Sequence, residues 1–343
     1  MDAHRGTAIL GVVCIHTCGT FLYRTPPNIS PATWWLLAIL TSVSKVGVPL
    51  FLMLSGTVNL GSPSKSLIDR AYVRRLLRIL VPFTFWALVY MSIKPKGGFR
   101  WITWAEASGL LSGQVHYHLW FIYSLIGLYI ISPILNAFVI AIGEYQSLLV
   151  GGFLLGLAGL EWSVENAFPF WFDANLFKPV PVYTGYYILG YGLRSVKVTL
   201  LIRDYALVVF VASTVISLGI TDYLNREVAS FDNRGFHNLN PVVMVMSIAA
   251  FAMLKPVEEI PGNSHPSRIM HIFASLGRGS FGVYLSHVML LEASFDYGYW
   301  SNRQVQEAIP VALLVPVATI LITFVSWLGT TRLSKIPFVR RLI

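Results

Sequence analysis

Apolar residues follow one another in long blocks along this chain, and polar segments separate the blocks. Blocks of about 20 residues recur from one end to the other, which is the length that crosses a bilayer as an α-helix. Strands would alternate apolar and polar residues, and only helices or closed barrels satisfy their backbone hydrogen bonds in lipid. The pattern therefore predicts an all-α polytopic membrane protein. We expect about ten transmembrane helices, at approximately 6–24, 34–60, 78–94, 118–140, 147–160, 179–195, 203–221, 238–256, 276–294 and 308–331.

The composition agrees with a chain that lies mostly in lipid. Hydrophobic residues make up 55% of the 343 positions and charged residues only 12%, about half of the roughly 25% that is usual in soluble domains. The first apolar segment continues as a full span and lacks a small-residue cleavage site, so we expect no cleavable signal peptide. No internal repeat and no room for a separate soluble domain is apparent, and residues 1–343 are expected to form a single transmembrane domain.

Basic residues are distributed unevenly between the predicted loops. With the N-terminus in the cytoplasm, 16 of the 25 Lys and Arg residues fall on the cytoplasmic side, 8 fall on the outer side, and Lys45 falls within a span. Cytoplasmic loops of membrane proteins carry such an excess of Lys and Arg, so both termini are predicted to be cytoplasmic. The same bias explains the net charge of +9 without a nucleic-acid partner.

Two ionisable groups stand at the ends of the apolar stretch "RGTAILGVVCIH", residues 5–16. At about 100° and ~1.5 Å per residue, Arg5 and His16 lie on one helix face about 16 Å apart. Arg5 is then expected at the cytoplasmic headgroup level and His16 near the bilayer centre, where ionisable groups are costly and often functional. The alternatives are an arginine that only reaches the membrane surface and a histidine that only hydrogen-bonds a neighbouring helix.

A basic cluster precedes the third predicted span, in "RAYVRRLLRILVPF", residues 70–83. Its arginines follow helical spacings of three and four, at Arg70, Arg74, Arg75 and Arg78. Guanidinium groups bind phosphate through paired hydrogen bonds, so the cluster is a candidate phosphate clamp. Positive-inside anchoring against anionic lipid is the alternative explanation.

Histidines also occur in two later segments. In "SFGVYLSHVML", residues 280–290, His287 is expected at the same depth as His16, which suggests a shared polar cavity. Two unrelated interhelical hydrogen bonds are the alternative. His118 and Trp120 lie at the outer end of the fourth predicted span, where they fit either the outer side of a site or an interfacial aromatic belt.

Other chemistries find little support in the sequence. Cys14, His16 and Cys18 stand on one predicted helix, which rarely converges three metal ligands, and the two cysteines are poorly placed for a disulfide. We find no glycine-rich nucleotide loop and no hydrolase or metalloprotease motif. We therefore expect no metal and no tightly bound cofactor.

Five segments in order resemble the integral-membrane acyltransferase family 3, over nearly the whole chain. The family's first-span motif is a basic residue, ten other residues and a histidine, which Arg5 and His16 match. The other four segments are "VPLFLMLSG" (48–56), "VRRLLRILVPF" (73–83), "YHLWFIYSLIGLYIISPIL" (117–135) and "SFGVYLSH" (280–287).

The resemblance implies a multi-pass enzyme of the bacterial cytoplasmic (inner) membrane. Its donor would be acyl-CoA, usually acetyl-CoA, taken from the cytoplasm, and its acceptor a hydroxyl of a lipid-linked or surface glycan. A glycan or lipid transporter is the alternative, because polar residues at the bilayer midplane also mark transport pathways.

On the acyltransferase interpretation, each candidate residue has an expected role. His16 is the general base for the hydroxyl, and His287 orients His16 or binds the oxyanion. Arg74, Arg75 and Arg78 hold the phosphates of acyl-CoA with help from Arg5, and the acceptor approaches past His118 and Trp120. A covalent acyl-histidine intermediate is an alternative to direct transfer.

Overall fold

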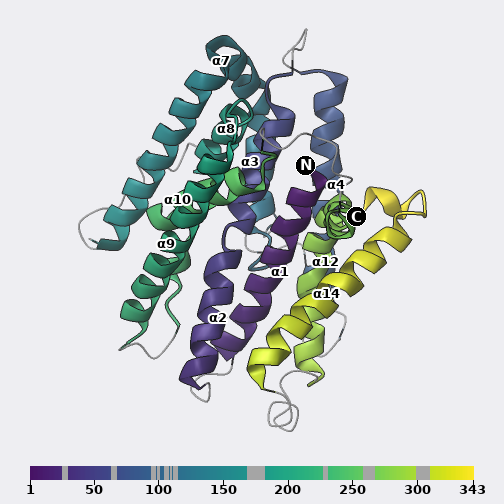
Figure 1. Cartoon of the computed structure of the whole chain (residues 1–343). Coiled ribbons are helices and arrows are strands. Elements are labelled where there is room, and N and C mark those ends of the chain that lie inside the picture. The colour runs from purple at the N-terminus through teal and green to yellow at the C-terminus, as the bar shows by residue number, and fades with distance from the viewer. Residues whose placement is uncertain are drawn as a thin grey trace.

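The computed structural model describes residues 1–24, 30–62, 68–93, 98, 101–103, 108, 110, 115–167, 182–226, 231–257, 267–298 and 310–343. Within these residues the secondary structure is helical apart from isolated bridges such as that between Val198 and Val257. Figure 1 shows the helices gathered into one bundle. The elements are α1 (Asp2–Arg24), α2 (Pro31–Ser44), α3 (Gly47–Asn59), α4 (Arg70–Ser92), α7 (Trp120–Ala167), α8 (Thr184–Gly192), α9 (Leu200–Asn225), η2 (Arg234–Phe236), α10 (Pro241–Leu254), α11 (Arg268–Arg278), α12 (Ser280–Asp296), α14 (Val311–Leu333) and η3 (Val339–Arg341).

The all-helical, membrane-spanning class predicted from the sequence agrees with the structure. Seven helical segments among the described residues are long and apolar enough to cross a bilayer. The predicted spans 179–195 and 276–294 are represented by α8, whose nine residues are too few for a full span, and by α12, whose 17 residues are at the lower limit. The number of about ten spans and the cytoplasmic location of both termini stay predictions.

Two predicted spans, 118–140 and 147–160, correspond to the single element α7, which begins two residues after the first of them, at Trp120. Gly143 interrupts this 48-residue element with φ 80° and ψ 173°, which lie outside the helical range. A positive φ of this kind favours glycine, which has no Cβ to clash with the backbone. The predicted spans therefore lie on either side of the break at Gly143.

The predicted span 34–60 is also divided. α2 ends at Ser44, α3 begins at Gly47, and Lys45 and Val46 form a turn between them. A Cβ added to Gly47 would lie only 2.7 Å from the carbonyl oxygen of Ala8 in α1. The absence of a side chain at this glycine lets the turn approach α1 closely, which holds Lys45 inside the bundle.

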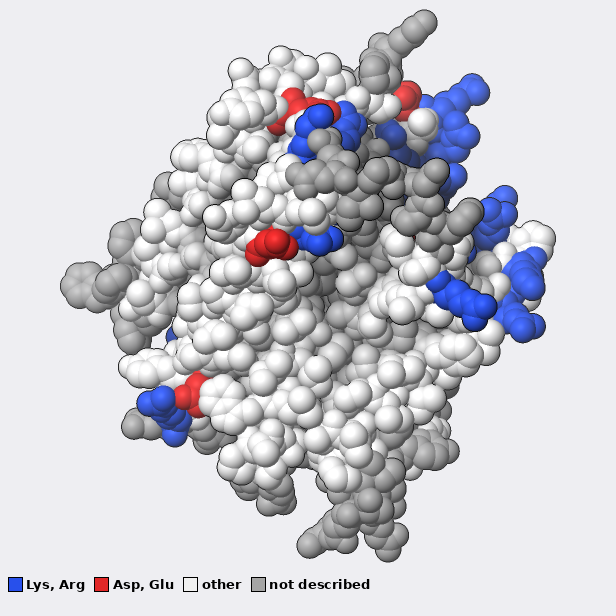
Figure 2. All heavy atoms as spheres, in the orientation of Figure 1, with Lys and Arg blue, Asp and Glu red and all other residues white. Residues whose placement is uncertain are grey.

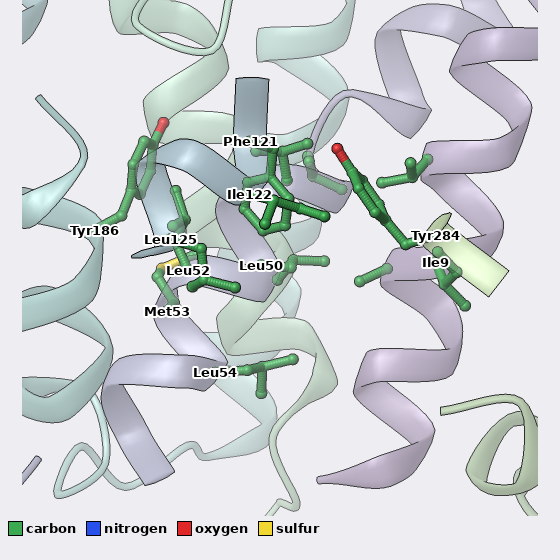
Figure 3. Close-up of a cluster of buried hydrophobic side chains, with 14 of the residues drawn as sticks. Ile9, Leu50, Leu52, Met53, Leu54, Phe121, Ile122, Leu125, Tyr186 and Tyr284 are labelled. Atoms are coloured by element: carbon green, nitrogen blue, oxygen red, sulfur yellow. The ribbon is translucent and has the colours of Figure 1, made fainter. Parts of the chain in front are cut away.

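α1 occupies the middle of the bundle. It packs against α2, α3, α11, α12 and α14. Figure 3 shows part of the buried core beside it, where Ile9 of α1, Leu50 of α3, Phe121 of α7 and Tyr284 of α12 belong to one cluster. Residues on α1 are therefore surrounded by other helices, which places His16 within reach of several of them.

Charged side chains are gathered at one end of the visible face. Figure 2 shows Lys and Arg over the upper part and the right edge, while the lower half is nearly free of charge apart from a group at the lower left. Both ends of the chain lie in the same upper half of Figure 1. One basic end and one apolar body are what the positive-inside pattern leads us to expect.

Candidate active site

Arg5 and His16 stand on one uninterrupted helix. α1 runs from Asp2 to Arg24 without a break, so the eleven-residue spacing corresponds to about 16 Å along the helix axis. The guanidinium of Arg5 lies in the first turn, 3.9 Å from the carboxylate of Asp2. His16 lies in the second half of α1, beside α12.

Three histidine rings from separate segments converge next to α1. The ring centroid of His16 lies 5.1 Å from that of His287 in α12 and 6.2 Å from that of His118 in the turn before α7. The rings of His118 and His287 are 5.7 Å apart, and both side chains are fully buried. His16 and His287, which were expected to share a cavity, are thus adjacent, and His118 joins them instead of lying at the surface.

The hydrogen bonds of His287 fix its tautomer. Its Nδ1 lies 2.7 Å from the carbonyl oxygen of Tyr284 and 3.0 Å from that of Val283. Carbonyl oxygens only accept hydrogen bonds, so we assign the proton of the neutral ring to Nδ1. Nε2 then carries a lone pair, and this buried atom has no hydrogen-bond partner among the described residues.

A chain of contacts through His116 fixes the tautomer of His118 as well. Nε2 of His116 lies 3.3 Å from a carboxylate oxygen of Glu292, and the Nδ1 atoms of His116 and His118 are 2.8 Å apart. If His116 donates to Glu292 through Nε2, its Nδ1 accepts the proton of His118 Nδ1. His118 is then left with a lone pair on Nε2, which is buried and has no partner within the described part of the chain.

Two tyrosines hold this arrangement in place. The hydroxyl of Tyr284 donates to the carbonyl oxygen of His118, and the hydroxyl of Tyr90 donates to that of Leu285 at 2.8 Å. The ring of Tyr90 also lies 4.5 Å from His116 and 4.8 Å from His118. These contacts join α4, α12 and the turn before α7, so the histidines are positioned by several helices.

The cluster is suited to reversible protonation of His16. A histidine that takes up a proton on one ring nitrogen carries an N–H on the other, which needs an acceptor. The lone pairs assigned to His118 and His287 can supply one, since both belong to rings that neighbour His16. Proton transfer by a histidine that is supported in this way is the usual basis of general acid–base catalysis.

A cavity of about 390 Å³ leads from His16 towards the far end of α1. His16 and Ile15 lie at one end, and Tyr23 lies seven residues further along the helix, which is about 11 Å. The remaining lining residues are Gly19, Thr20, Leu22, Thr41, Lys45, Tyr117, Trp120, Phe231, Asn233 and Phe236. Aromatic side chains therefore make up much of the wall, as in sites that hold an organic ligand. Trp120, expected on the acceptor side, is one of them.

The arginines predicted to bind the acyl-CoA donor differ in their exposure. Arg75 is half-buried, and its charge, like that of Arg5, acts on Tyr129 in α7. The hydroxyl of Tyr129 accepts a hydrogen bond of 2.8 Å from the amide of Asn59. Arg5 and Arg75 thus both lie within electrostatic range of Tyr129.

The other two arginines of the predicted clamp are more exposed. Arg74 donates through Nε to the carbonyl oxygen of Arg70 in its own helix, at 3.2 Å. Arg78 is exposed and stands one turn further along α4. Of the three predicted clamp residues, Arg75 is the least exposed.

Sequence reasoning missed several members of this site. His116 and Glu292 had no assigned role, although Glu292 is a carboxylate inside the predicted span 276–294, which was an available signal. Lys45 was noted only as the one basic residue within a span. Cys14 and Cys18 are free, with their sulfur atoms 3.9 Å apart. No group of three or more His, Cys, Asp or Glu residues that could hold a metal ion occurs in the part of the chain that the structure describes.

One comparison with known proteins gives a match. A family model described as an acyltransferase domain matches residues 1–331, which is nearly the whole chain. No curated protein and no solved structure matches the chain.

Proposed function

The chain belongs to this acyltransferase family, and from that premise we propose that it is a membrane-bound O-acyltransferase. It moves an acyl group, most simply acetyl, from cytoplasmic acyl-CoA to a hydroxyl of a lipid-linked or surface glycan. The observation that carries the proposal is the meeting of His16, His118 and His287 at the end of a cavity inside a helical membrane bundle.

His16 is the proposed base, because it is the member of the cluster that lines the cavity. As the acceptor oxygen attacks the thioester carbonyl carbon, its proton passes to His16, and a C–O bond forms. The tetrahedral intermediate then collapses, the C–S bond breaks, and the thiolate of CoA takes the proton back from His16. The products are the acyl ester and free CoA, and His16 returns to its neutral form.

His118 and His287 act on His16 and not on the acceptor. A lone pair of one of them accepts the N–H of His16 that faces away from the cavity, which stabilises the charge that forms during attack and leaves the other ring nitrogen for the acceptor hydroxyl. Both rings are buried, so water does not compete for this hydrogen bond. Glu292 supports the arrangement through His116 by fixing the tautomer of His118.

The donor enters from the basic end of the bundle. The charges of Arg5 and Arg75 both act on Tyr129, and guanidinium groups suit the phosphates of CoA. The pantetheine arm is long enough to carry a thioester along α1 to His16, about 16 Å away. The spacing between Arg5 and His16 thus sets the distance between the bound phosphates and the reacting carbonyl.

The acceptor enters from the opposite end, through the cavity beside Trp120. Aromatic faces such as that of Trp120 suit the stacking of sugar rings, and threonine and asparagine side chains supply hydrogen bonds to hydroxyls. Four segments, "IHT", "SPATW", "VPLF" and "YHLWF", resemble those of the O-acetyltransferase that modifies enterobacterial common antigen. We therefore propose a glycan of the bacterial envelope as the acceptor and the inner membrane as the location.

The deciding experiment is an assay of group transfer. Purified protein is incubated with radiolabelled acetyl-CoA and a panel of lipid-linked and soluble glycans, and labelled glycan and free CoA are measured. The proposal expects both products in equal amounts. A protein that moves a glycan or lipid across proteoliposome membranes while leaving acetyl-CoA intact would instead be the transporter considered above.

A further inference from the structure

Lys45 lines the cavity without a partner of opposite charge. No carboxylate pairs with its ammonium group among the described residues. A lysine inside a membrane bundle is costly and is usually retained for a purpose. Because Lys45 lines the wall beside His16, the cavity is suited to a ligand that carries a negative charge.

A second polar group in the wall is also unsatisfied. Thr41 stands one helical turn before Lys45 and lines the same cavity, and its buried hydroxyl has no oxygen or nitrogen partner in the described part of the chain. Its polar neighbour is the thiol of Cys18, a weak hydrogen-bonding group. An ammonium and a hydroxyl four residues apart can bind two oxygens of one anionic group.

The described residues in the rest of the wall supply no negative charge, because none of them is Asp or Glu. Asp232, next to the lining residue Asn233, is already paired with Arg234 at 2.7 Å, and the hydrogen bond from Arg234 holds the pKa of this carboxyl below its usual range. Lys45 is therefore the one Lys, Arg, Asp or Glu side chain among the described residues that line the cavity.

The depth of Lys45 in the membrane limits which anionic groups can reach it. The turn between α2 and α3 lies level with Ala8 and Val12 of α1, because Gly47 packs against both residues. Val12 is twelve residues from Arg24 at the far end of α1, which is about 18 Å along the axis. A lipid phosphate lies at the headgroup level, whereas a charged group on the sugar itself can enter this far with the reacting hydroxyl.

We propose that the acceptor is an acidic glycan, and that Lys45 and Thr41 bind a carboxylate on the sugar that receives the acyl group. This inference rests on the proposed acyltransferase function and adds the substrate class. Lys45 positions the acceptor beside His16, so a neutral sugar of the same shape binds less well.

The test compares each acceptor with its carboxyl-reduced form, in which CH₂OH replaces the carboxylate. Labelled acetyl-CoA and the purified protein are supplied with both forms, and kcat/KM is measured for each. The wild-type protein should prefer the acidic form by roughly tenfold or more, the effect of one charge-assisted hydrogen bond. K45M should lose this preference, and K45R should keep most of it. K335M, which removes an exposed lysine outside the cavity, should behave as the wild type.

Each contrary outcome has a distinct meaning. Equal use of acidic and reduced acceptors by the wild-type protein would overturn the inference and leave the acyltransferase function intact. A fall of kcat in K45M by the same factor on both forms would assign Lys45 to the reacting carbonyl instead. Equal use of the two forms, together with a loss of activity in K45M only when the acceptor carries the lipid phosphate, would assign Lys45 to that phosphate. Absence of labelled product with every acceptor, with acetyl-CoA intact, would contradict the proposed function itself.

Discussion

The rings of His16 and His287 lie 5.1 Å apart, although 270 residues separate them in the sequence. His287 is held by two backbone carbonyls through Nδ1, which leaves Nε2 directed to no other partner among the described residues. A proton arriving on His16 therefore meets a neighbouring lone pair whose orientation the backbone of α12 determines. This pairing is the basis of the first prediction.

H287Q and H287L should differ. Glutamine keeps an oxygen that can accept the N–H of protonated His16, whereas leucine fills the space without an acceptor. We expect kcat to fall further in H287L than in H287Q, with the KM for acyl-CoA unchanged in both, in steady-state acetyl-transfer assays. Equal losses in the two variants would show that His287 contributes packing and not a hydrogen bond.

Glu292 is expected to influence the reaction through His116. E292Q keeps the shape of the side chain but no longer stabilises a donor at His116 Nε2 by charge, so the tautomer of His118 is less firmly fixed. We expect a reduced kcat and an altered pH profile of kcat, with donor affinity retained. D222N is the control, because Asp222 pairs with Arg226 on α9, outside the cavity wall, and it should keep the wild-type profile. Identical profiles for all three proteins would remove Glu292 from the mechanism.

The arginines of α4 should contribute unequally to donor binding. Arg75 is half-buried and acts with Arg5 on Tyr129, whereas Arg74 is exposed and bonded to its own helix. R75A should raise the KM for acyl-CoA by about tenfold or more, as expected for the loss of a charge-assisted hydrogen bond, and R74A by less. Binding of CoA to the purified variants gives the same ranking independently. If protein yield falls while donor affinity is unchanged, the arginines serve insertion in the membrane and not the donor.

The contact between α3 and α8 is too close to accommodate a side chain at Gly190. A Cβ on Gly190 would lie 2.0 Å from the carbonyl oxygen of Met53, so G190L must separate two helices that now touch. We expect a lower Tm and less monodisperse protein after purification. G152L is the matched control, because no atom lies within 4 Å of a Cβ at Gly152. A Tm for G190L equal to that of G152L would contradict this packing.

The orientation of the bundle is open to direct measurement. Lys and Arg gather at one end of the molecule (Figure 2), and the sequence places 16 basic residues on the side of the termini against 8 on the other. Reporter fusions should locate the C-terminus in the cytoplasm and the segment 223–237 outside. A C-terminus found outside would reverse the entry path that we propose for acyl-CoA.

The sequence predicted those features that depend on a single helix. The relation of Arg5 to His16 follows from the geometry of one continuous helix, and the pattern of apolar blocks gave the helical class. The shared depth of His16 and His287 came from counting residues along two spans. These inferences need no knowledge of which helices are neighbours.

The features that the sequence did not predict depend on lateral contacts. Hydropathy does not say which helices touch, so the contact of Glu292 with His116, and of His116 with His118, had no signature along the chain. Lys45 was visible as a lysine inside a span, but its place in the cavity wall follows from the break between α2 and α3. The break itself lies within a continuous apolar run, where periodicity gives no boundary.

The most direct test of the account is the turnover of H16Q. Glutamine can keep a hydrogen bond at this position but cannot take the proton of the acceptor hydroxyl, and general bases contribute roughly 10²–10⁴-fold to rates. We predict that purified H16Q inserts in the membrane and binds acyl-CoA as the wild type does, and that its kcat for acetyl transfer falls by at least about 100-fold. Near-normal acetyl transfer by H16Q would contradict the central claim, and His287 would then be the first residue to examine as the base.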